Sequence, residues 1–270
     1  MIAFVDQDPS PQEVEGLRLI LSTYQDGTGM LAVPGGKTLP GWRDFERAVA
    51  LAFDGEGPEN KAVFDVLLTD PANPSVKYGL SCKMRKELNR IGRDGRVTVE
   101  LSNSAGQFWD QLALKSISTD NYKEQPQEVG KTLINLVRRW HRAAAAERKA
   151  TVDLDKSGYL VLSWNNAGLY QLHQLSLQLP NPEELSWYFP TGVSKGVEKT
   201  ARHINGDDAE GRVFEWYGES GGQLKYYPKA SSALWHSEPF RLEPLPDIEH
   251  GIRAKVAAYF PELWQALYPD

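Results

Sequence analysis

An aspartate, a serine and a lysine stand in two short stretches of this chain where their side chains can act together. Asp65 interrupts the apolar run KAVFDVLLTD, and Ser81 and Lys83 belong to the stretch YGLSCKMR. Both stretches are typical of β-strands, and in a strand alternate side chains lie on the same face. Ser81 and Lys83 therefore share one face, while Cys82 between them points to the other. An aspartate on a neighbouring strand lies within reach of both.

This combination of residue types suits the hydrolysis of phosphodiester bonds. Such a reaction uses a divalent cation held by carboxylates, which polarises the phosphoryl oxygen and lowers the pKa of a bound water. A lysine beside the cation orients that water or stabilises the charge that develops. We therefore expect Lys83 to face a polar cleft, with Asp65 as a metal ligand and Cys82 packed behind as a small apolar residue.

Residues 40–112 resemble the PD-(D/E)xK nuclease superfamily and, within it, the type II restriction endonucleases. The order of features carries the resemblance: a helix with Glu46, a strand with Asp65, a strand with Ser81-x-Lys83, a basic helix and the stretch VELSNSAGQFW. The resemblance implies a mixed sheet flanked by helices, Mg²⁺ as cofactor and double-stranded DNA as substrate. It also implies catalytic roles for Asp65, Ser81 and Lys83.

Two positions depart from the pattern of that superfamily. Phe64 stands where a proline often precedes the aspartate, and Ser81 stands where an acid is expected. A serine hydroxyl lacks the charge that a carboxylate brings to Mg²⁺. In restriction enzymes with serine at this position, a glutamate from a later element supplies the acid. The resemblance therefore makes Glu100 the first candidate and Glu46 the second, each as a catalytic residue and metal ligand.

Other interpretations of the same residues stay open. Asp65 can be a turn residue at the end of a strand, Lys83 a surface lysine, and Glu46 and Glu100 solvent-exposed acids. A repair or phage-defence nuclease that reads DNA structure competes with a restriction enzyme. So does an inactive DNA-binding or interaction module on a nuclease fold, for which Ser81 marks the loss of activity. Proximity of Glu100 or Glu46 to Asp65 favours a nuclease, and acids that point away favour the inactive module.

The elements that must position these residues alternate between helices and strands in the first 150 residues. The stretch SPQEVEGLRL starts with a capping serine, a proline and a glutamate three residues after the serine, which is typical of a helix start. In GWRDFERAVALAF the apolar residues recur at helical spacing. We expect helices over 11–26 and 42–53, strands over 61–70, 78–85 and 95–104, a basic helix over 84–93, and helices over 106–114 and 127–149.

Beyond residue 150 strands and turns predominate. GYLVLSW and LYQLHQLSLQL flank NNAG as one hairpin, VFEWYG and QLKYYP flank ESGG as another, and a final helix is expected over 248–267. We therefore expect an α/β (α+β) fold. Its nuclease core, residues 1–150, is a mixed sheet flanked by helices, and an antiparallel β-rich extension, residues 151–270, packs on it. The alternative is a single domain over residues 1–270.

Composition and cysteine usage exclude several classes of protein. The chain of 270 residues is 41% hydrophobic and 24% charged, and it contains no apolar run of the roughly 18 residues that cross a bilayer. A single cysteine, Cys82, excludes an intramolecular disulfide and a zinc site built on several thiolates. Walker and GxGxxG motifs are absent from the sequence. The amino-terminal segment does not resemble a secretory signal, so we expect a cytoplasmic protein.

Basic side chains gather in two segments of an otherwise acidic chain. The formal net charge is -6, yet residues 83–96 carry six Lys/Arg against two acids, and residues 131–149 carry six against one. Because phosphate contacts need local positive charge, both segments are candidates for tracking DNA, and polar hairpin residues are candidates for base contacts. The candidate DNA-binding residues are Arg85, Lys86, Arg90, Arg93, Arg138, Arg139, Arg142, Asn165 and Asn166, with Gln171, His173 and Gln174 as further polar residues of the first hairpin.

The resemblance to restriction enzymes also implies partners. A palindromic DNA site is matched by a homodimer in which each subunit cuts one strand. A restriction enzyme also belongs to a restriction-modification system with a cognate DNA methyltransferase. We therefore expect double-stranded DNA, a second copy of the chain and such a methyltransferase as partners, and no membrane.

Overall fold

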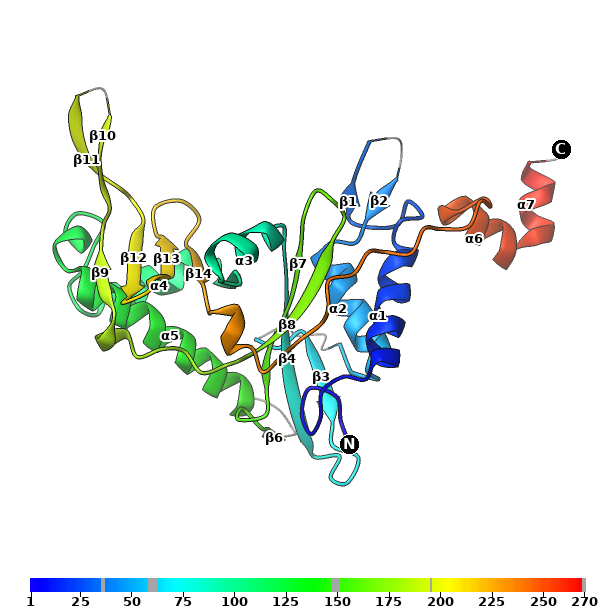
Figure 1. Ribbon diagram of the computed structural model, residues 1–270, viewed down its shortest axis with the longest axis horizontal. Helices are drawn as coiled ribbons and strands as arrows, with labels where there is room; N and C mark the ends of the chain where they lie inside the picture. The colour runs from blue at the N-terminus through cyan, green and yellow to red at the C-terminus, as the bar shows by residue number, and fades with distance from the viewer. Residues whose placement is uncertain (35–36, 58–62, 147–150, 195, 269–270) are drawn as a thin grey trace.

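The computed structural model describes residues 1–34, 37–57, 63–146, 151–194 and 196–268, and it confirms the expected mixed α/β fold (Figure 1). The helices are α1 (Pro11–Thr23), α2 (Trp42–Ala52), α3 (Leu88–Asp94), α4 (Ala105–Ala113), α5 (Pro126–Ala146), α6 (Gly251–Tyr259) and α7 (Pro261–Leu267). The strands are β1 (Leu31–Ala32), β2 (Thr38–Leu39), β3 (Val66–Thr69), β4 (Val76–Arg85), β5 (Val99–Ser102), β6 (Thr151–Val152), β7 (Gly158–Trp164), β8 (Tyr170–Ser176), β9 (Ser186–Tyr188), β10 (Thr191–Ser194), β11 (Val197–Thr200), β12 (Ile204–Asp208), β13 (Gly211–Tyr217), β14 (Gln223–Tyr226) and β15 (Trp235–His236).

The central sheet is mixed, and β4 has a strand on each side. Within the described chain its strand order is β15-β8-β7-β4-β3, and β6 also pairs with β4. β4 runs antiparallel to β3 and parallel to β7, which it meets from Leu80 to Arg85. β7 and β8 form the first expected hairpin. A strand with neighbours on both sides has its backbone hydrogen bonds satisfied, so β4 is a rigid support for the side chains it carries.

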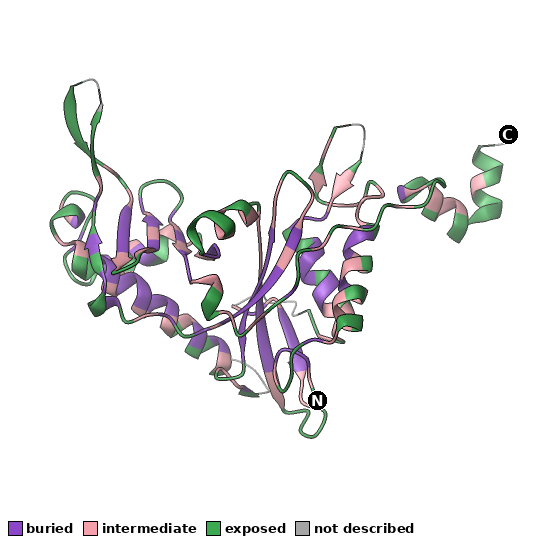
Figure 2. Ribbon diagram, viewed as in Figure 1, coloured by how far each residue is buried: buried purple, intermediate pink, exposed green. Residues whose placement is uncertain are grey.

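Helices α1 and α2 cover one face of the central sheet. Ser10 and Glu13 form the expected capping box at the start of α1. Leu17 of α1 and Phe45 of α2 pack in one buried cluster with Cys82 of β4. Figure 2 shows the buried ribbon of these helices turned toward the sheet. The apolar spacing that predicted both helices is therefore the surface by which they cover β4.

A second, antiparallel sheet lies beside the first, with α4 and α5 packed against it (Figure 1). In the described residues its strand order is β5-β14-β13-β12-β9. Phe108 of α4 and Trp216 of β13 contact edge to face, with ring centroids 5.8 Å apart. Gly130 of α5 leaves room for the ring of Trp187, because a Cβ at Gly130 would lie 2.0 Å from that ring. Helices α4 and α5 therefore pack against the second sheet through aromatic side chains of β13 and β9.

Residue 150 does not separate the two sheets. The central sheet joins β3 and β4 to β7 and β8, and the second sheet joins β5 to β14. Each sheet is thus built by hydrogen bonds between strands from both sides of residue 150. The separation into a core over 1–150 and an extension over 151–270 differs from this arrangement, because β7 pairs directly with β4, the strand that carries Lys83, and β8 pairs with β7.

Several element boundaries differ from the sequence prediction. β3 begins at Val66, so Asp65 precedes the strand, and α3 begins only at Leu88, after the first basic residues of the stretch expected to be helical. The final helix is broken into α6 and α7 before Pro261, which lacks the backbone N–H that a continuous helix needs. Residues 147–149 of the long basic helix lie outside the described residues.

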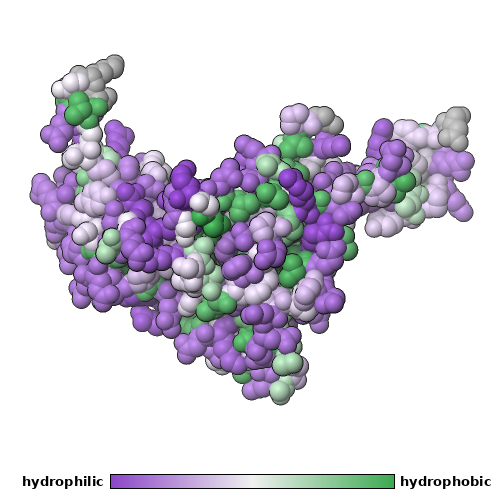
Figure 3. Space-filling view, in the orientation of Figure 1, coloured by the Kyte–Doolittle hydropathy of each residue, from purple (hydrophilic) through white to green (hydrophobic). Residues whose placement is uncertain are grey.

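The hairpin β10–β11 and helices α6 and α7 project from the body and are largely exposed (Figure 2). Figure 3 shows hydrophobic side chains gathered at the centre of the visible face, over β7 and β8, with hydrophilic side chains around them. Within the described part of the chain, no helix has the length and apolarity required to cross a membrane.

Candidate active site

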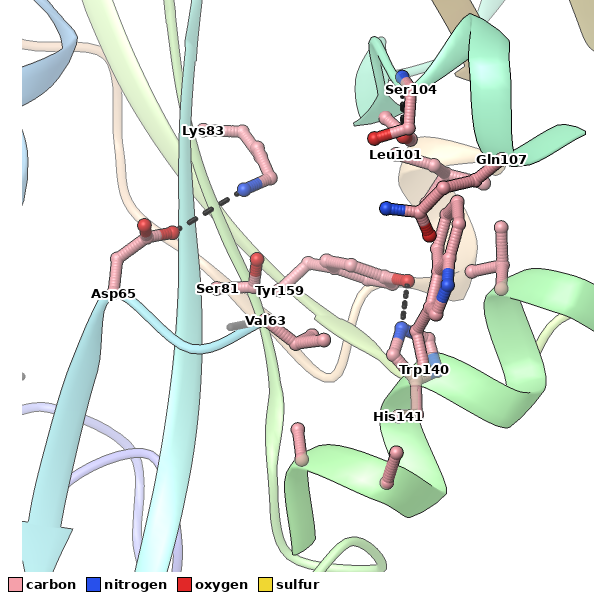
Figure 4. A pocket seen from close by; sticks show the side chains of 14 residues that line it. Val63, Asp65, Ser81, Lys83, Leu101, Ser104, Gln107, Trp140, His141 and Tyr159 are labelled. Atoms are coloured by element: carbon pink, nitrogen blue, oxygen red, sulfur yellow. Dashed lines mark hydrogen bonds and ion pairs between the residues drawn. The ribbon is translucent and has the colours of Figure 1, made fainter. Parts of the chain in front are cut away.

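A pocket of about 290 Å³ lies between the central sheet and helices α4 and α5 (Figure 4). Asp65, Ser81 and Lys83 line one side of it, as the sequence predicted. Gln107 of α4 and His141 of α5 line the other side and face the strand residues across the cavity. The cleft that Lys83 was expected to face is therefore present.

Lys83 and Asp65 form an ion pair inside this pocket. The Lys83 Nζ lies 3.3 Å from Asp65 Oδ2, and the two side chains are 22% and 12% exposed. The backbone N–H of Cys82 donates to the same carboxylate oxygen at 2.9 Å. The backbone N–H of Asp65 donates to Leu80 O at 2.9 Å, which extends the pairing of β3 and β4 by one residue. Backbone pairing therefore fixes the carboxylate beside the lysine.

The alternation of β4 separates polar from apolar side chains as expected. Ser81 is 2% exposed and lines the pocket with Lys83, whereas Cys82 is 4% exposed and packs with Leu80 and the helices on the opposite face. Tyr159 of β7 lies opposite Ser81 in the parallel register, so it also faces the pocket. The face of the central sheet that carries Lys83 is therefore the polar one at this point.

His141 and Tyr159 form a buried pair in the wall of the pocket that the sequence analysis did not single out. The Tyr159 hydroxyl lies 3.0 Å from His141 Nε2. Burial, helped by the positive charge of Lys83, lowers the pKa of His141 to about 4, so its ring is neutral at pH 7 and can accept a hydrogen bond from the tyrosine hydroxyl. Burial also raises the pKa of Tyr159. One signal was available: His141 follows Val137 by four residues and so continues the apolar stripe of the long helix.

Glu100 and Glu46 are not brought into the pocket. Arg85 Nη1 lies 2.5 Å from a carboxylate oxygen of Glu100, and Gln223 Nε2 donates to the same oxygen at 2.7 Å. Glu100 lies on β5, which pairs with β14 and not with β4. Glu46 is 8% exposed on α2, whose buried side packs against the face of the central sheet that carries Cys82. Neither acid lines the pocket with Asp65.

Comparison of the chain with protein families, with curated proteins and with solved structures finds no match. Functional inference therefore rests on the pocket and its surroundings.

The basic residues near the end of β4 have different surroundings. Arg85 pairs with Glu100, and the Arg90 guanidinium lies 3.9 Å above the Tyr227 ring with Asp94 as ion partner. Arg93 is exposed and pairs with Asp94. Lys86 is exposed, and its Nζ lies 5.0 Å from the Trp164 ring. Among these candidates Lys86 and Arg93 are the most accessible to phosphate.

The arginines of α5 also divide into structural and accessible side chains. Arg138 Nη2 donates to the carbonyl oxygens of Leu179 and Pro180 at 3.0 and 3.1 Å, which ties α5 to the segment after β8. Arg139 is exposed and donates to Gln111, whereas Arg142 is exposed. Arg142 is therefore the arginine of α5 best placed to reach a DNA backbone.

The polar residues of the first hairpin are mostly used within the fold. The side chain of Asn165 accepts from the backbone of the turn, while Asn166 is exposed. His173 and Gln174 are 2% and 6% exposed, and Gln174 donates to a backbone carbonyl. Gln171 donates to the carbonyl of Ser237. His173 and Gln174 are therefore too deeply buried to contact bases.

The donor set of the pocket fits a weakly held hard cation. Asp65 is the one carboxylate among the described residues that line it, and hydroxyl or amide oxygens come from Ser81, Ser102, Ser104 and Gln107. Across the described chain, no group of three or more His, Cys, Asp and Glu side chains is arranged to hold a metal. Mg²⁺ keeps several waters and commonly takes one or two carboxylates plus substrate phosphates. A single aspartate therefore suits Mg²⁺ that arrives with a phosphate ligand.

Proposed function

We propose that this protein is a Mg²⁺-dependent endonuclease that hydrolyses phosphodiester bonds of double-stranded DNA. One observation carries the proposal: Asp65, Ser81 and Lys83, selected from the sequence as a catalytic set, line a single pocket with an ion pair between its acid and its base. The basic side chains Lys86, Arg93 and Arg142 are exposed and available to DNA phosphates. The pocket supplies the chemistry, and these residues supply the local positive charge.

Each residue of the pocket has its own role in the proposed reaction. Asp65 would hold Mg²⁺, and the bound ion would polarise a phosphoryl oxygen and lower the pKa of a bound water. Lys83 donates hydrogen bonds to the non-bridging oxygens of the phosphate and stabilises their negative charge. Ser81 donates a hydrogen bond from the same face of β4. The neutral His141 and Tyr159 form a fixed wall opposite, so the phosphate is confined between the strand and α5.

An inactive DNA-binding module is the second candidate, and a specific observation favours it. Glu100 and Glu46, the acids expected to replace the one missing at Ser81, do not line the pocket with Asp65. A pocket with one carboxylate holds a cation less tightly than one with two. The nuclease proposal therefore requires that substrate phosphate completes the ligand shell.

The biological setting is proposed on the resemblance to restriction enzymes alone. In that setting the enzyme acts in the cytoplasm as a homodimer on a specific sequence, beside a cognate methyltransferase. A repair or phage-defence nuclease that recognises DNA structure is the alternative setting. The two are distinguished by whether cleavage gives discrete fragments that methylation of the DNA prevents.

The test is cleavage of a mixed, unmethylated DNA pool by the purified protein with Mg²⁺ or with chelator. Lys83→Met and Asp65→Asn are compared with Lys77→Met. Lys77 lies on the same strand and is likewise paired with an acid, Glu56 at 2.7 Å, but does not line the pocket. We expect Mg²⁺-dependent cleavage that falls at least 100-fold in the two pocket variants, in line with the loss of a group that stabilises charge (about 10²–10³). The Lys77→Met variant retains cleavage.

Two results would contradict the nuclease proposal. Intact DNA in every lane with folded protein, together with measurable DNA binding, would establish the binding module. Cleavage that survives in both Lys83→Met and Asp65→Asn would place the chemistry elsewhere in the molecule. A Glu100→Gln variant adds a further check: loss of cleavage there, with the fold intact, would show that Glu100 moves into the pocket when DNA binds.

A further inference from the structure

A second concave site lies where β4 and β7 end and α2 begins. This groove has a volume of about 290 Å³, near the lower limit of typical small-molecule sites (roughly 300–1,000 Å³). Its walls include two tryptophans, Trp42 of α2 and Trp164 of β7, with Met84 and Lys86 of the β4 end between them. It is separate from the pocket of Asp65 and Lys83, since the two sites share no lining residue.

One indole ring of the groove is accessible to solvent, and the other is held in place by packing. Trp42 is 45% exposed. Trp164 is half-buried and stacks on Tyr170, with ring centroids 6.1 Å apart, and Tyr170 stacks in turn on Phe240 at 6.0 Å. This row of rings holds Trp164 in one orientation. Trp42 is therefore the more accessible of the two rings for a planar ligand.

Cationic side chains stand beside both rings. The Arg43 guanidinium lies 4.8 Å from the Trp42 ring centroid, and Lys86 Nζ lies 5.0 Å from that of Trp164. Both cations are exposed, and neither forms an ion pair with another described residue. Among the described residues that line the groove the one acid is Glu87, and it already accepts from Thr98 at 2.6 Å. The rim is thus positive while the floor is aromatic and apolar.

We propose that this groove binds an unpaired base of a DNA strand, stacked on Trp42 or Trp164, while Arg43 and Lys86 contact the flanking phosphates. Aromatic platforms flanked by positive charge are how proteins hold single-stranded nucleic acid without reading its sequence. The inference rests on the proposed DNA substrate and adds a strand-holding site to it. The groove lies on the α2 side of the central sheet, whereas Lys83 lies on the other side, so a DNA strand that occupies both sites passes around the ends of β4 and β7.

The test measures binding in chelator, so that cleavage plays no part. Fluorescence anisotropy compares a blunt duplex with the same duplex carrying a single-stranded tail, and a 2-aminopurine in the tail reports stacking by its quenching. We expect tighter binding and quenching for the tailed DNA. Trp42→Ala should weaken tailed binding by roughly 5- to 150-fold, the effect of losing one stacked base, and leave blunt binding unchanged. Trp42→Phe, which keeps a ring, should restore much of it.

The matched control is Leu51→Ala, since Leu51 is 70% exposed on the same helix and does not line the groove. Equal affinity of the wild type for tailed and blunt DNA would overturn the proposal. So would a loss of tail preference in Arg43→Gln or Lys86→Gln that Trp42→Ala does not reproduce, because charge alone would then hold the strand. Self-association that Trp42→Ala abolishes, without any tail preference, would instead make the groove an interface between two copies.

These outcomes are distinct from failure of the nuclease proposal. Tail binding that depends on Trp42, in a protein that never cleaves DNA, would keep the groove and reject the nuclease. Cleavage that depends on Lys83, with no tail preference, would keep the nuclease and reject the groove.

Discussion

The Asp65–Lys83 pair combines a structural and a chemical role in one contact. Asp65 is held by the backbone N–H of Cys82 as well as by Lys83, and both charged side chains are mostly buried. Removing one partner leaves the other charge in a poorly solvated place, which destabilises a protein more than removing both. The pair is therefore testable by stability alone, whether or not the protein is an enzyme.

We expect Lys83→Met or Asp65→Asn alone to lower the free energy of unfolding by about 1–3 kcal/mol, since each leaves a polar group without its partner. The loss of stability in the double variant should be smaller than the sum of the two single losses. The difference should be about 0.5–3 kcal/mol, the range for residues in contact. Urea unfolding of the four proteins measures this coupling. A coupling near zero would show that the two side chains do not meet in solution.

His141 provides a pH-dependent test at the same site. Its pKa is lowered from 6.5 to about 4 in the folded protein, mainly by burial. Between these pH values the unfolded chain binds the proton and the folded chain does not. The contribution to stability is therefore fully present above about pH 6.5 and is lost as pH falls toward 4.

We expect the stability of the wild type to fall more steeply than that of His141→Gln between pH 7 and pH 4, by roughly 2–4 kcal/mol. His173, whose pKa burial also lowers to about 4, is present in both proteins, so its contribution cancels. Urea unfolding at several pH values gives both curves. Parallel curves would mean that His141 has a similar pKa in the folded and unfolded protein, and hence that its ring is accessible to water in the folded protein.

At the scale of elements, β4 is the support on which both proposed sites depend. Its first half is fixed against β3 by a close contact: a Cβ at Gly79 would lie 2.3 Å from the ring of Phe64, the residue before Asp65. A side chain here cannot be accommodated without moving that ring. Packing at Gly79 and the position of Asp65 are therefore linked.

Gly79→Ala should destabilise the protein by about 1–3 kcal/mol, because inserted atoms in a packed interior force side chains out of place. Gly92→Ala is the matched control, since nothing lies within 4 Å of a Cβ at that position of α3. That change should raise stability by about 0.4–1 kcal/mol through the lower entropy of the unfolded chain. Thermal unfolding of both variants checks the pair, and similar shifts in both would contradict the contact between Gly79 and Phe64.

At the scale of the whole molecule, the proposed DNA binding has to work against an overall charge of -6. Local cations such as Arg142 therefore decide the salt dependence. If Arg142 contacts a phosphate, Arg142→Gln should reduce the slope of log affinity against log salt concentration by about 0.9. Anisotropy titrations from low to moderate salt measure the slope.

Arg138→Gln is the informative comparison for that experiment. Because Arg138 donates to the carbonyls of Leu179 and Pro180, its loss should lower stability and leave the salt slope unchanged. The reverse pattern, a lower slope for Arg138→Gln and none for Arg142→Gln, would show that α5 meets DNA through its other side.

Local patterns in the sequence determined much of this protein. The capping box at Ser10, the helical spacing of α2 and the alternation of Ser81, Cys82 and Lys83 each depend on residues within a few positions of one another. Such patterns fix which side chains share a face, because helix and strand periods are properties of the backbone. Asp65 and Lys83 were also correctly expected to meet, because a short turn joins the two strands beside which they lie.

The tertiary structure decided which distant residues completed the pocket. Glu100 has the residue type that a metal site needs, yet β5 pairs with β14, and Arg85 and Gln223 take up its carboxylate. His141 and Tyr159 carried no motif, and the packing of α5 over β7 brings them together. Strand order and helix packing arise from the burial of apolar surface over the whole chain, which is non-directional and leaves no local signature in the sequence.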